Sequence, residues 1–176
     1  MEIVRIPHER IGILTDEKNK NKKKIEKKCT VELHIETDGE VEIEGENINT
    51  FFARDVIKAI GRGFTVEQAL KIVEDNYQFY LIDLDDHAHT ENAKVRIRGR
   101  IIGEKGKIKA EIESATECIL SIYGDTIGII AKIDTIEYAK EALSMLISGA
   151  PHATLFIYLA KIRRQIFNER LRGKRS

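Results

Sequence analysis

The chain of 176 residues repeats its own residue pattern after an interval of 87. When the sequence is shifted by that interval without a gap, Ile25 falls on Ile112 and Leu33 falls on Leu120. Other matched pairs are Gly12 and Gly99, Ile35 and Ile122, Asp38 and Asp125, Val56 and Leu143, and Ile60 and Ile147. A repeat of this length is too long for a solenoid unit and fits two copies of one small domain.

Each copy is expected to run in the order strand, helix, helix, strand, strand, helix. In the first copy, apolar and acidic residues alternate on both sides of Asp38-Gly39, which predicts a β-hairpin. The elements expected there are a strand at 2–7, helices at 8–14 and 20–29, strands at 31–35 and 41–43, and a helix at 49–60. In the second copy they are a strand at 77–84, helices at 91–102 and 107–116, strands at 118–123 and 127–131, and a helix at 134–147.

Two further helices complete the expected α+β chain. Thr65-Val66-Glu67-Gln68 resembles a capping box, so a linker helix is expected from residue 65. A last helix is expected over residues 152–171, because Leu155, Leu159, Ile162 and Ile166 recur on one side.

Gly103-Glu104-Lys105-Gly106, called the glycine loop below, separates the first two helices of the second copy. From Lys94 to Lys109 the chain holds seven basic residues and one acid. Glycines let a backbone approach a phosphate chain closely, and basic neighbours neutralise that chain. The sequence therefore predicts a grip on single-stranded nucleic acid. The alternative is that the two glycines only permit a tight turn between helices.

The element order, together with Ile101-Ile102 and the glycine loop, resembles the type I KH domain. The linker Gly61-Arg62-Gly63-Phe64 and the ending at residues 146–151 resemble the Partner-of-Nob-one (Dim-two) family of small-subunit ribosomal RNA assembly proteins, in its archaeal form. The resemblance implies two tandem type I KH domains (βααββα), each a three-stranded antiparallel sheet with helices on one face, plus a C-terminal helix. The implied bounds are 1–64 for a degenerate first KH domain, 65–76 for the linker helix, 77–150 for the second KH domain, and 151–176 for the C-terminal helix and basic tail.

The resemblance implies that the glycine loop clamps about four unpaired nucleotides. Phosphate contacts are expected from Arg100, Lys105, Lys107 and Lys109, and an aliphatic floor for bases from Ile101, Ile102, Ile112 and part of the strand at 118–122. Glu104 is expected to point to solvent, and Ile108 replaces the small hydroxyl residue that is frequent in the family. The full predicted RNA-binding set is Arg98, Gly99, Arg100, Ile101, Ile102, Gly103, Glu104, Lys105, Gly106, Lys107, Lys109, Ile112, Ile119, Leu120 and Ser121.

Asp16-Glu17-Lys18-Asn19, called the first-copy loop below, stands at the position of the glycine loop. It has no glycine and two acids, so it is expected not to clamp RNA in the KH manner, and only Asn19 readily takes a left-handed conformation. Lysines crowd the helix that follows. Auxiliary phosphate contacts are predicted for Lys20, Lys23, Lys24, Lys27, Arg172, Lys174 and Arg175. The alternative for the lysine run is a solvated helix face.

The two hairpins differ in their outer faces. The first is acidic and suits solvent or a basic protein partner. The second is apolar on both faces, which predicts a sheet buried on both sides. We expect the first copy or the C-terminal helix to cover its outer face, a prediction that exposed side chains at both Ile119 and Ile129 would contradict.

No enzymatic motif is recognised in the sequence, so the chain is expected not to be an enzyme and to need no cofactor. A polar cluster fits no metal-ligand spacing, and a loop leading into a helix explains it, so no metal is expected. It comprises Asp83, Asp85, Asp86, His87, His89 and Glu91. Cys29 and Cys118 sit among apolar residues and are expected to be buried free thiols. No apolar run approaches the length of a membrane span, and the chain is expected to be cytoplasmic.

The function implied by the resemblance is single-stranded RNA binding by the second KH domain, in assembly and processing of small-subunit (16S) ribosomal RNA near its 3′ end. The implied partners are this RNA, a Nob-one-like endonuclease, and other pre-ribosomal or initiation factors, with no membrane. Two alternatives are open. One is a protein-interaction adaptor, and the other is a sister Krr-one-type assembly factor with the same domain pair.

Overall fold

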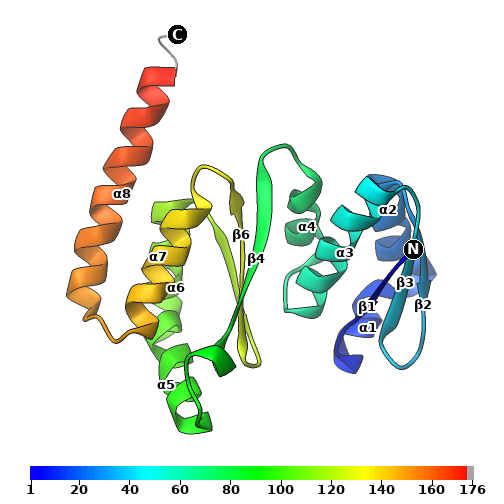
Figure 1. The fold of residues 1–176 in the computed structure, drawn as a ribbon, viewed down its shortest axis with the longest axis horizontal. Coiled ribbons are helices and arrows are strands. Elements are labelled where there is room, and N and C mark those ends of the chain that lie inside the picture. Colours follow the sequence, from blue (N-terminus) through cyan, green and yellow to red (C-terminus); the bar gives the residue numbers. More distant parts are fainter. Residues whose placement is uncertain (174–176) are drawn as a thin grey trace. The chain divides into compact units, whose positions relative to one another are not determined.

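A computed structural model describes residues 1–173 of the chain, which form two compact units (Figure 1). The first unit comprises Met1–Phe79 together with Ser121–Gly124. The second comprises Tyr80–Leu120 and the chain from Asp125 onward.

The first unit holds a three-stranded antiparallel sheet in the order β1-β3-β2. In register, Leu33 lies opposite Ile43 and Val4 lies opposite Val41, and these apolar side chains are buried. Helix α3 adds Val56, Ile57 and Ile60 to this core. The elements are β1 (Glu2–Arg5), α1 (His8–Leu14), the 3-10 turn η1 (Glu17–Asn19), α2 (Lys20–Cys29), β2 (Glu32–Ile35), β3 (Glu40–Glu44), α3 (Asn47–Gly61), α4 (Val66–Ala69) and the 3-10 turn η2 (Leu70–Val73).

The second sheet has the matching order β4-β6-β5 and three helices follow the same sequence order around it. Its elements are β4 (Tyr77–Asp83), the 3-10 turn η3 (Leu84–Asp86), α5 (Glu91–Ile102), the 3-10 turn η4 (Glu104–Gly106), α6 (Lys107–Thr116), β5 (Ile119–Tyr123), β6 (Thr126–Lys132), α7 (Ile136–Ile147) and α8 (His152–Gly173). Two three-stranded antiparallel sheets with helices are consistent with KH domains.

Helix bounds follow the sequence pattern closely. Helices α1, α2, α5 and α6 have the predicted bounds. The capping box is confirmed, because Thr65 Oγ1 accepts from the Gln68 amide at 3.2 Å and Gln68 Oε1 accepts from the Thr65 amide at 3.0 Å. The expected start of α7 at residue 134 is wrong by two residues. Thr135 is the N-cap of α7, and no side chain forms a capping hydrogen bond there.

Strand β6 is buried on both faces, as predicted. Successive residues of a strand point to opposite faces, and every residue from Thr126 to Ala131 is buried. Ile129 is fully buried and Ile119 is half-buried, so the contradicting exposure does not occur.

Helix α8 lies on the helical layer of the second unit. Leu155, Leu159, Ile162 and Ile166 are buried along the side of α8 that contacts α6 and α7 (Figure 1). The suggestion that α8 covers the outer face of the second sheet is therefore wrong. Among the described residues, no helix is both long and apolar enough to cross a membrane.

Candidate nucleic-acid interface

The glycine loop is a left-handed turn between two helices. Helix α5 ends at Ile102, and Gly103 follows with φ +71° and ψ 177°. Lys105 has φ +50° and Gly106 has φ +74° before α6 begins at Lys107. The Gly106 amide donates to the Gly103 carbonyl at 3.2 Å, which closes the turn.

Gly103 and Gly106 contribute to the loop in different ways. A Cβ atom on Gly103 would lie 2.3 Å from Ile108 Cγ1 and 3.0 Å from the Ile108 amide nitrogen, so the packing admits no side chain there. A Cβ atom on Gly106 would meet nothing within 4 Å. Gly103 therefore shapes the loop, whereas Gly106 leaves the start of α6 open to approach.

The N-cap of α6, Gly106, forms no side-chain capping hydrogen bond. The first amides of a helix lack intrahelical partners and favour anions. Lys105 and Lys107 flank these amides and are exposed. Glu104 is exposed as well, which agrees with the expectation that it points to solvent. This combination suits a phosphate group.

Two of the basic residues assigned to phosphates by the sequence have partners within the protein. Arg100 donates through Nη2 to the Ala150 carbonyl, and its Nε is buried without a partner in the described structure. Lys109 Nζ lies 2.9 Å from Glu113 Oε1, one helical turn further along α6. The exposed cations nearest in sequence to Gly106 are Lys105 and Lys107.

The apolar residues assigned to a base-binding floor divide into two groups. Ile101, Ile112 and Leu120 are buried, so their side chains support the surface from the core. Ile102 is 39% exposed and Ile119 is half-buried. Ser121 is half-buried, and Gly99 is exposed on α5.

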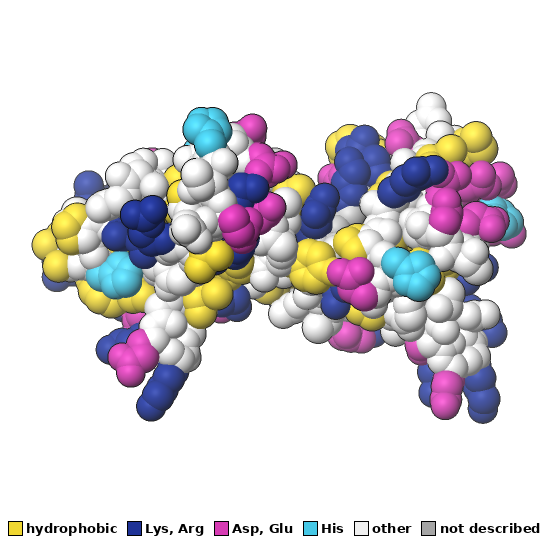
Figure 2. Space-filling view, turned by 90° about the horizontal axis from the view of Figure 1, so that it is seen from below, with side chains coloured by type: hydrophobic (Ala, Val, Ile, Leu, Met, Phe, Trp, Pro, Cys, Tyr) yellow, Lys and Arg dark blue, Asp and Glu magenta, His cyan; other side chains and the backbone are white. Residues whose placement is uncertain are grey.

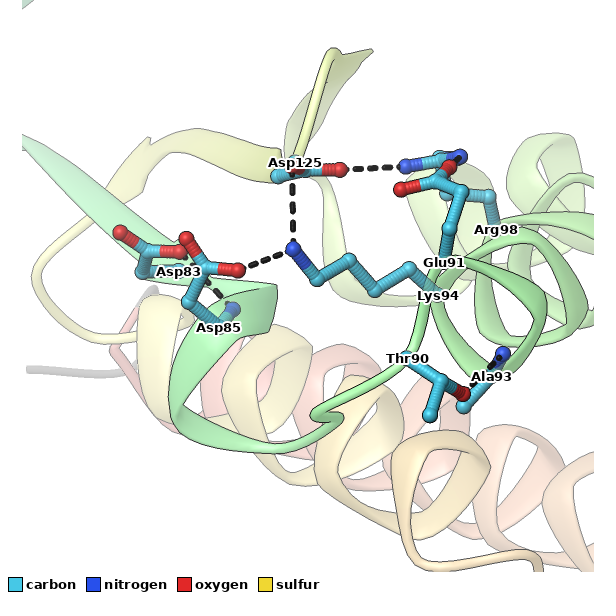
Figure 3. A network of polar contacts seen from close by, with 8 residues as sticks. All are labelled: Asp83, Asp85, Thr90, Glu91, Ala93, Lys94, Arg98 and Asp125. Carbon is cyan, nitrogen blue, oxygen red and sulfur yellow. Dashed lines mark hydrogen bonds and ion pairs between the residues drawn. The ribbon is translucent and has the colours of Figure 1, made fainter.

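Arg98 lies in an ion-pair network around the turn between β5 and β6 (Figure 3). Arg98 Nη1 donates to Asp125 Oδ1 at 2.7 Å, and Arg98 also pairs with Glu91. Lys94 Nζ donates to Asp125 at 3.1 Å and contacts Asp85. Hydrogen bonds from Lys94, then from Arg98, lower the pKa of Asp125.

Three members of the polar cluster noted in the sequence, Asp83, Asp85 and Glu91, have partners in this region. Asp83 accepts from the Asp85 amide at 2.9 Å, and Thr90 caps α5 by accepting from the Ala93 amide at 3.2 Å (Figure 3). Within residues 1–173, the one group of acids and histidine whose ligand atoms come within 4.8 Å of one another is elsewhere, at Glu32, His34 and Glu44, and all three are exposed.

In each copy a glutamate side chain accepts a hydrogen bond from an edge-strand amide, a contact that we call the glutamate latch. The sequence analysis did not predict it. Glu113 Oε1 accepts from the Leu120 amide of edge strand β5 at 2.8 Å. Glu26 Oε1 accepts from the Leu33 amide of edge strand β2 at 2.9 Å. The repeat interval relates these two pairs, and that interval was the signal that could have revealed them.

The first-copy loop supplies a carboxylate of its own to the start of the following helix. Asp16 Oδ1 accepts from the Asn21 amide, in the first turn of α2, at 2.9 Å. Lys18 and Asn19 both have positive φ, at +65° and +52°. The expectation that only Asn19 would take the left-handed conformation is therefore wrong.

The auxiliary lysines lie mostly on the exposed side of α2. Lys20, Lys23 and Lys27 are exposed, and Lys24 pairs with Glu67 at 2.7 Å. Arg172 is exposed on α8, whereas Lys174 and Arg175 lie outside the described residues. Both cysteines are free and buried, as expected.

Comparisons with known proteins give the family. A model of the second Pno1-type KH domain, described as a eukaryotic-type KH-domain (KH-domain type I), matches residues 78–164. A KH domain-containing protein of Methanocaldococcus jannaschii is 42% identical over 171 residues, which cover 94% of this chain and 75% of that protein. The crystal structure of Dim2p from Pyrococcus horikoshii OT3 is similar with a TM-score of 0.85 at 37% identity, over 91% of this chain and 98% of that chain. The chain belongs to the Partner-of-Nob-one (Dim-two) family.

Two further relatives carry functional descriptions. The a/eIF2alpha-aDim2p-rRNA complex of Pyrococcus horikoshii OT3 contains a chain with a TM-score of 0.86 and 36% identity, over 93% of this family member and 94% of that chain. The pre-rRNA-processing protein pno1 of Aspergillus oryzae is 32% identical over 112 residues, which cover 61% of this chain and 43% of that protein.

Proposed function

We propose that this chain binds single-stranded RNA through the glycine loop of its second KH domain and acts in processing of small-subunit (16S) ribosomal RNA near its 3′ end. The observation that carries the proposal is the open start of α6. Gly106 leaves space there, no side chain caps the helix, and Lys105 and Lys107 are exposed beside it. The rRNA complex of a related Dim2p and the name of the Aspergillus pno1 protein support the substrate.

In this mechanism, a phosphate sits at the first amides of α6 and accepts their hydrogen bonds. Lys105 and Lys107 supply charge, which gives affinity without sequence choice. Ile102 and Ile119 offer apolar contact to bases. Arg98, Arg100 and Lys109 act mainly through their partners inside the protein, because each is already held by a carbonyl or carboxylate.

The proposed arrangement is two tandem type I KH domains, at 1–64 and 77–150, joined by a linker at 65–76 and followed by 151–176. We further propose that the role is binding without catalysis, that it takes place in the cytoplasm, and that a Nob-one-like endonuclease and other pre-ribosomal or initiation factors are partners. The Pno1 and Dim2 names of the relatives favour a Partner-of-Nob-one-type role over that of a Krr-one-type assembly factor.

A protein-interaction role is a second candidate, and the acidic first sheet favours it. Glu32 lies opposite Glu44, and His34 lies opposite Glu42 on the outer face. Figure 2 shows acidic side chains gathered with a histidine at the right of the view, where β2 and β3 lie. Like charges across a strand pair are unfavourable, so a basic partner would relieve them.

Gly106→Asp tests the RNA-binding proposal directly. A carboxylate at this open position should repel the phosphate and weaken binding of an oligonucleotide with the 3′-terminal small-subunit sequence at least about tenfold. The matched control is Asn19→Asp, which adds the same charge at the corresponding position of the first-copy loop. Fluorescence anisotropy with the cognate and a scrambled oligonucleotide measures both. Equal affinity of Gly106→Asp and the unmodified chain would contradict the proposal.

A further inference from the structure

Helix α8 has a second apolar stripe opposite the one that packs on α6 and α7. Ile157 is 73% exposed, Phe167 is 62% exposed and Leu171 is 47% exposed. Together with other exposed residues they form what we call the outer seam, which consists of Ala153, Ile157, Ala160, Arg164, Phe167 and Leu171. The solvent side of a surface helix is usually polar, so this seam needs an explanation.

The spacing of the outer seam is that of a helix-packing surface. Its members recur at intervals of four, three, four, three and four residues, which is the alternation of core positions in a coiled coil. An open hollow of about 660 Å³ lies on this side, and the residues that line it belong to α8, among them Ile157, Ala160, Arg164 and Asn168. Another helix could place its own apolar residues between these side chains.

The inner side of α8 fixes how the outer seam is presented. Arg163 pairs with Glu111 of α6 at 3.3 Å, and Arg170 pairs with Glu117. Gln165 donates to the Tyr138 hydroxyl at 2.7 Å. Figure 1 shows α8 against α6 and α7 on one side, with its other side facing away from the second unit. A helix held in this way loses little freedom when it binds a partner.

The charges beside the seam select the partner. This side of α8 bears Lys161, Arg164 and Arg172 against one acid, Glu169. Arg164 stands in the middle of the seam itself. A partner helix with acidic residues beside its apolar positions would be complementary, and an acid opposite Arg164 would fix the register.

A second copy of this chain is disfavoured as the occupant. In a parallel pair each cation would meet its own counterpart. In an antiparallel pair centred on the seam, Arg164 would face Ala160, and the two Arg164 side chains would lie about one helical turn apart with Lys161 of both copies close by. Like charges held together destabilise an interface. RNA is also disfavoured, because the central positions of the stripe are mostly apolar and the cations lie mainly at its sides.

We propose that the outer seam of α8 docks an amphipathic helix of a partner protein, with apolar residues at the core positions and Asp or Glu beside them. This inference goes beyond RNA binding and does not depend on it, since no residue of the glycine loop takes part.

The test uses the full chain and two synthetic peptides of three heptads, about 21 residues each. Both carry leucine at the core positions; one has glutamate at the flanking positions and the other lysine, so neither pairs readily with itself. The chain should bind the glutamate peptide at least about tenfold more tightly in fluorescence anisotropy. Ile157→Glu or Phe167→Glu should remove at least about tenfold of that affinity, and Arg164→Glu should shift the preference toward the lysine peptide.

Val95→Glu is the matched control, because Val95 is an exposed apolar residue on α5, 53% exposed. It should leave peptide binding unchanged, and circular dichroism should show all variants folded. Equal binding of the two peptides, binding of neither, or an equal loss with Val95→Glu would overturn the proposal. So would a dimer in sedimentation that Ile157→Glu dissociates, or a loss of RNA binding in Phe167→Glu without any peptide binding.

Discussion

The glycine loop and the first-copy loop share a left-handed backbone at their third and fourth residues. They differ at their first residue, which determines whether the following helix can accept an external anion. Lys18 and Lys105 have φ of +65° and +50°, and Asn19 and Gly106 have φ of +52° and +74°. The first positions differ: Asp16 has φ −64°, whereas Gly103 has φ +71°. The left-handed turn therefore does not require glycine throughout.

The two loops differ in whether a side chain of the loop accepts a hydrogen bond from the helix that follows. The Asp16 carboxylate accepts from the Asn21 amide, so α2 already has an anion at its start. Neither Gly103 nor Gly106, the N-cap of α6, has a side chain that could accept from the first amides of α6. The comparison teaches that the turn and the capacity to take an external phosphate are separate properties.

The largest effect is expected at Gly103. Gly103→Ala places a Cβ 2.3 Å from Ile108 Cγ1 at a positive φ, so it should reduce the free energy of unfolding by about 3 kcal/mol. Denaturant titration measures this. The control is Gly99→Ala within α5, where a Cβ would meet nothing within 4 Å. That variant should be neutral or stabilising, because glycine is unfavourable inside a helix.

The next largest effect is expected from removing the glutamate latch, and the loss of unfolding free energy should be equal in the two copies. Glu113→Ala and Glu26→Ala each remove the acceptor of a part-buried strand amide, so each should cost about 1–2 kcal/mol in urea unfolding. Only Glu113→Ala should also weaken RNA binding, because Glu113 lies on α6, the helix that begins at the glycine loop, and also holds Lys109. Glu113→Gln, which keeps an acceptor oxygen, should restore most of the loss. Equal RNA affinities for the two alanine variants would remove the distinction between the copies.

Asp16→Ala tests the same comparison in the first-copy loop. Loss of the carboxylate leaves the amides at the start of α2 without their anion, so thermal and denaturant unfolding should show a loss of about 1 kcal/mol. RNA affinity should stay the same, since Glu17 remains and no glycine opens the loop. A gain in affinity comparable to the loss in Gly106→Asp would show that the carboxylate alone had blocked the first-copy loop.

Sequence reasoning located the elements and the loop but not the partners of its charged residues. The bounds of α5 and α6 could be predicted because the glycines and polar residues between them interrupt an apolar pattern. The family resemblance supplied the domain type. The contact from Arg100 to the Ala150 carbonyl joins residues 50 apart, and no local pattern contains such information. The left-handed Lys18 was missed because residue preference favoured Asn19, whereas the turn imposed its geometry on both residues.

The smallest effect concerns the matched turn aspartates, Asp38 and Asp125. Asp38 accepts only from the Glu40 amide at 3.1 Å among the hydrogen bonds resolved for it, whereas Asp125 pairs with Lys94 and Arg98. The pKa of Asp125 is lowered in the folded chain, so its contribution to stability is present above the unfolded pKa of about 3.9 and is lost as pH falls through the lower folded value.

Asp125→Asn should therefore reduce the melting temperature slightly at pH 7 and flatten its decline below about pH 4. Asp38→Asn should leave both features nearly unchanged, since the amide oxygen can still accept from the Glu40 amide. Calorimetric melting curves between neutral pH and about pH 2.5 compare the two variants in the window where Asp125 titrates. If both variants flatten the decline equally, the ion pairs around Asp125 do not distinguish the second hairpin from the first.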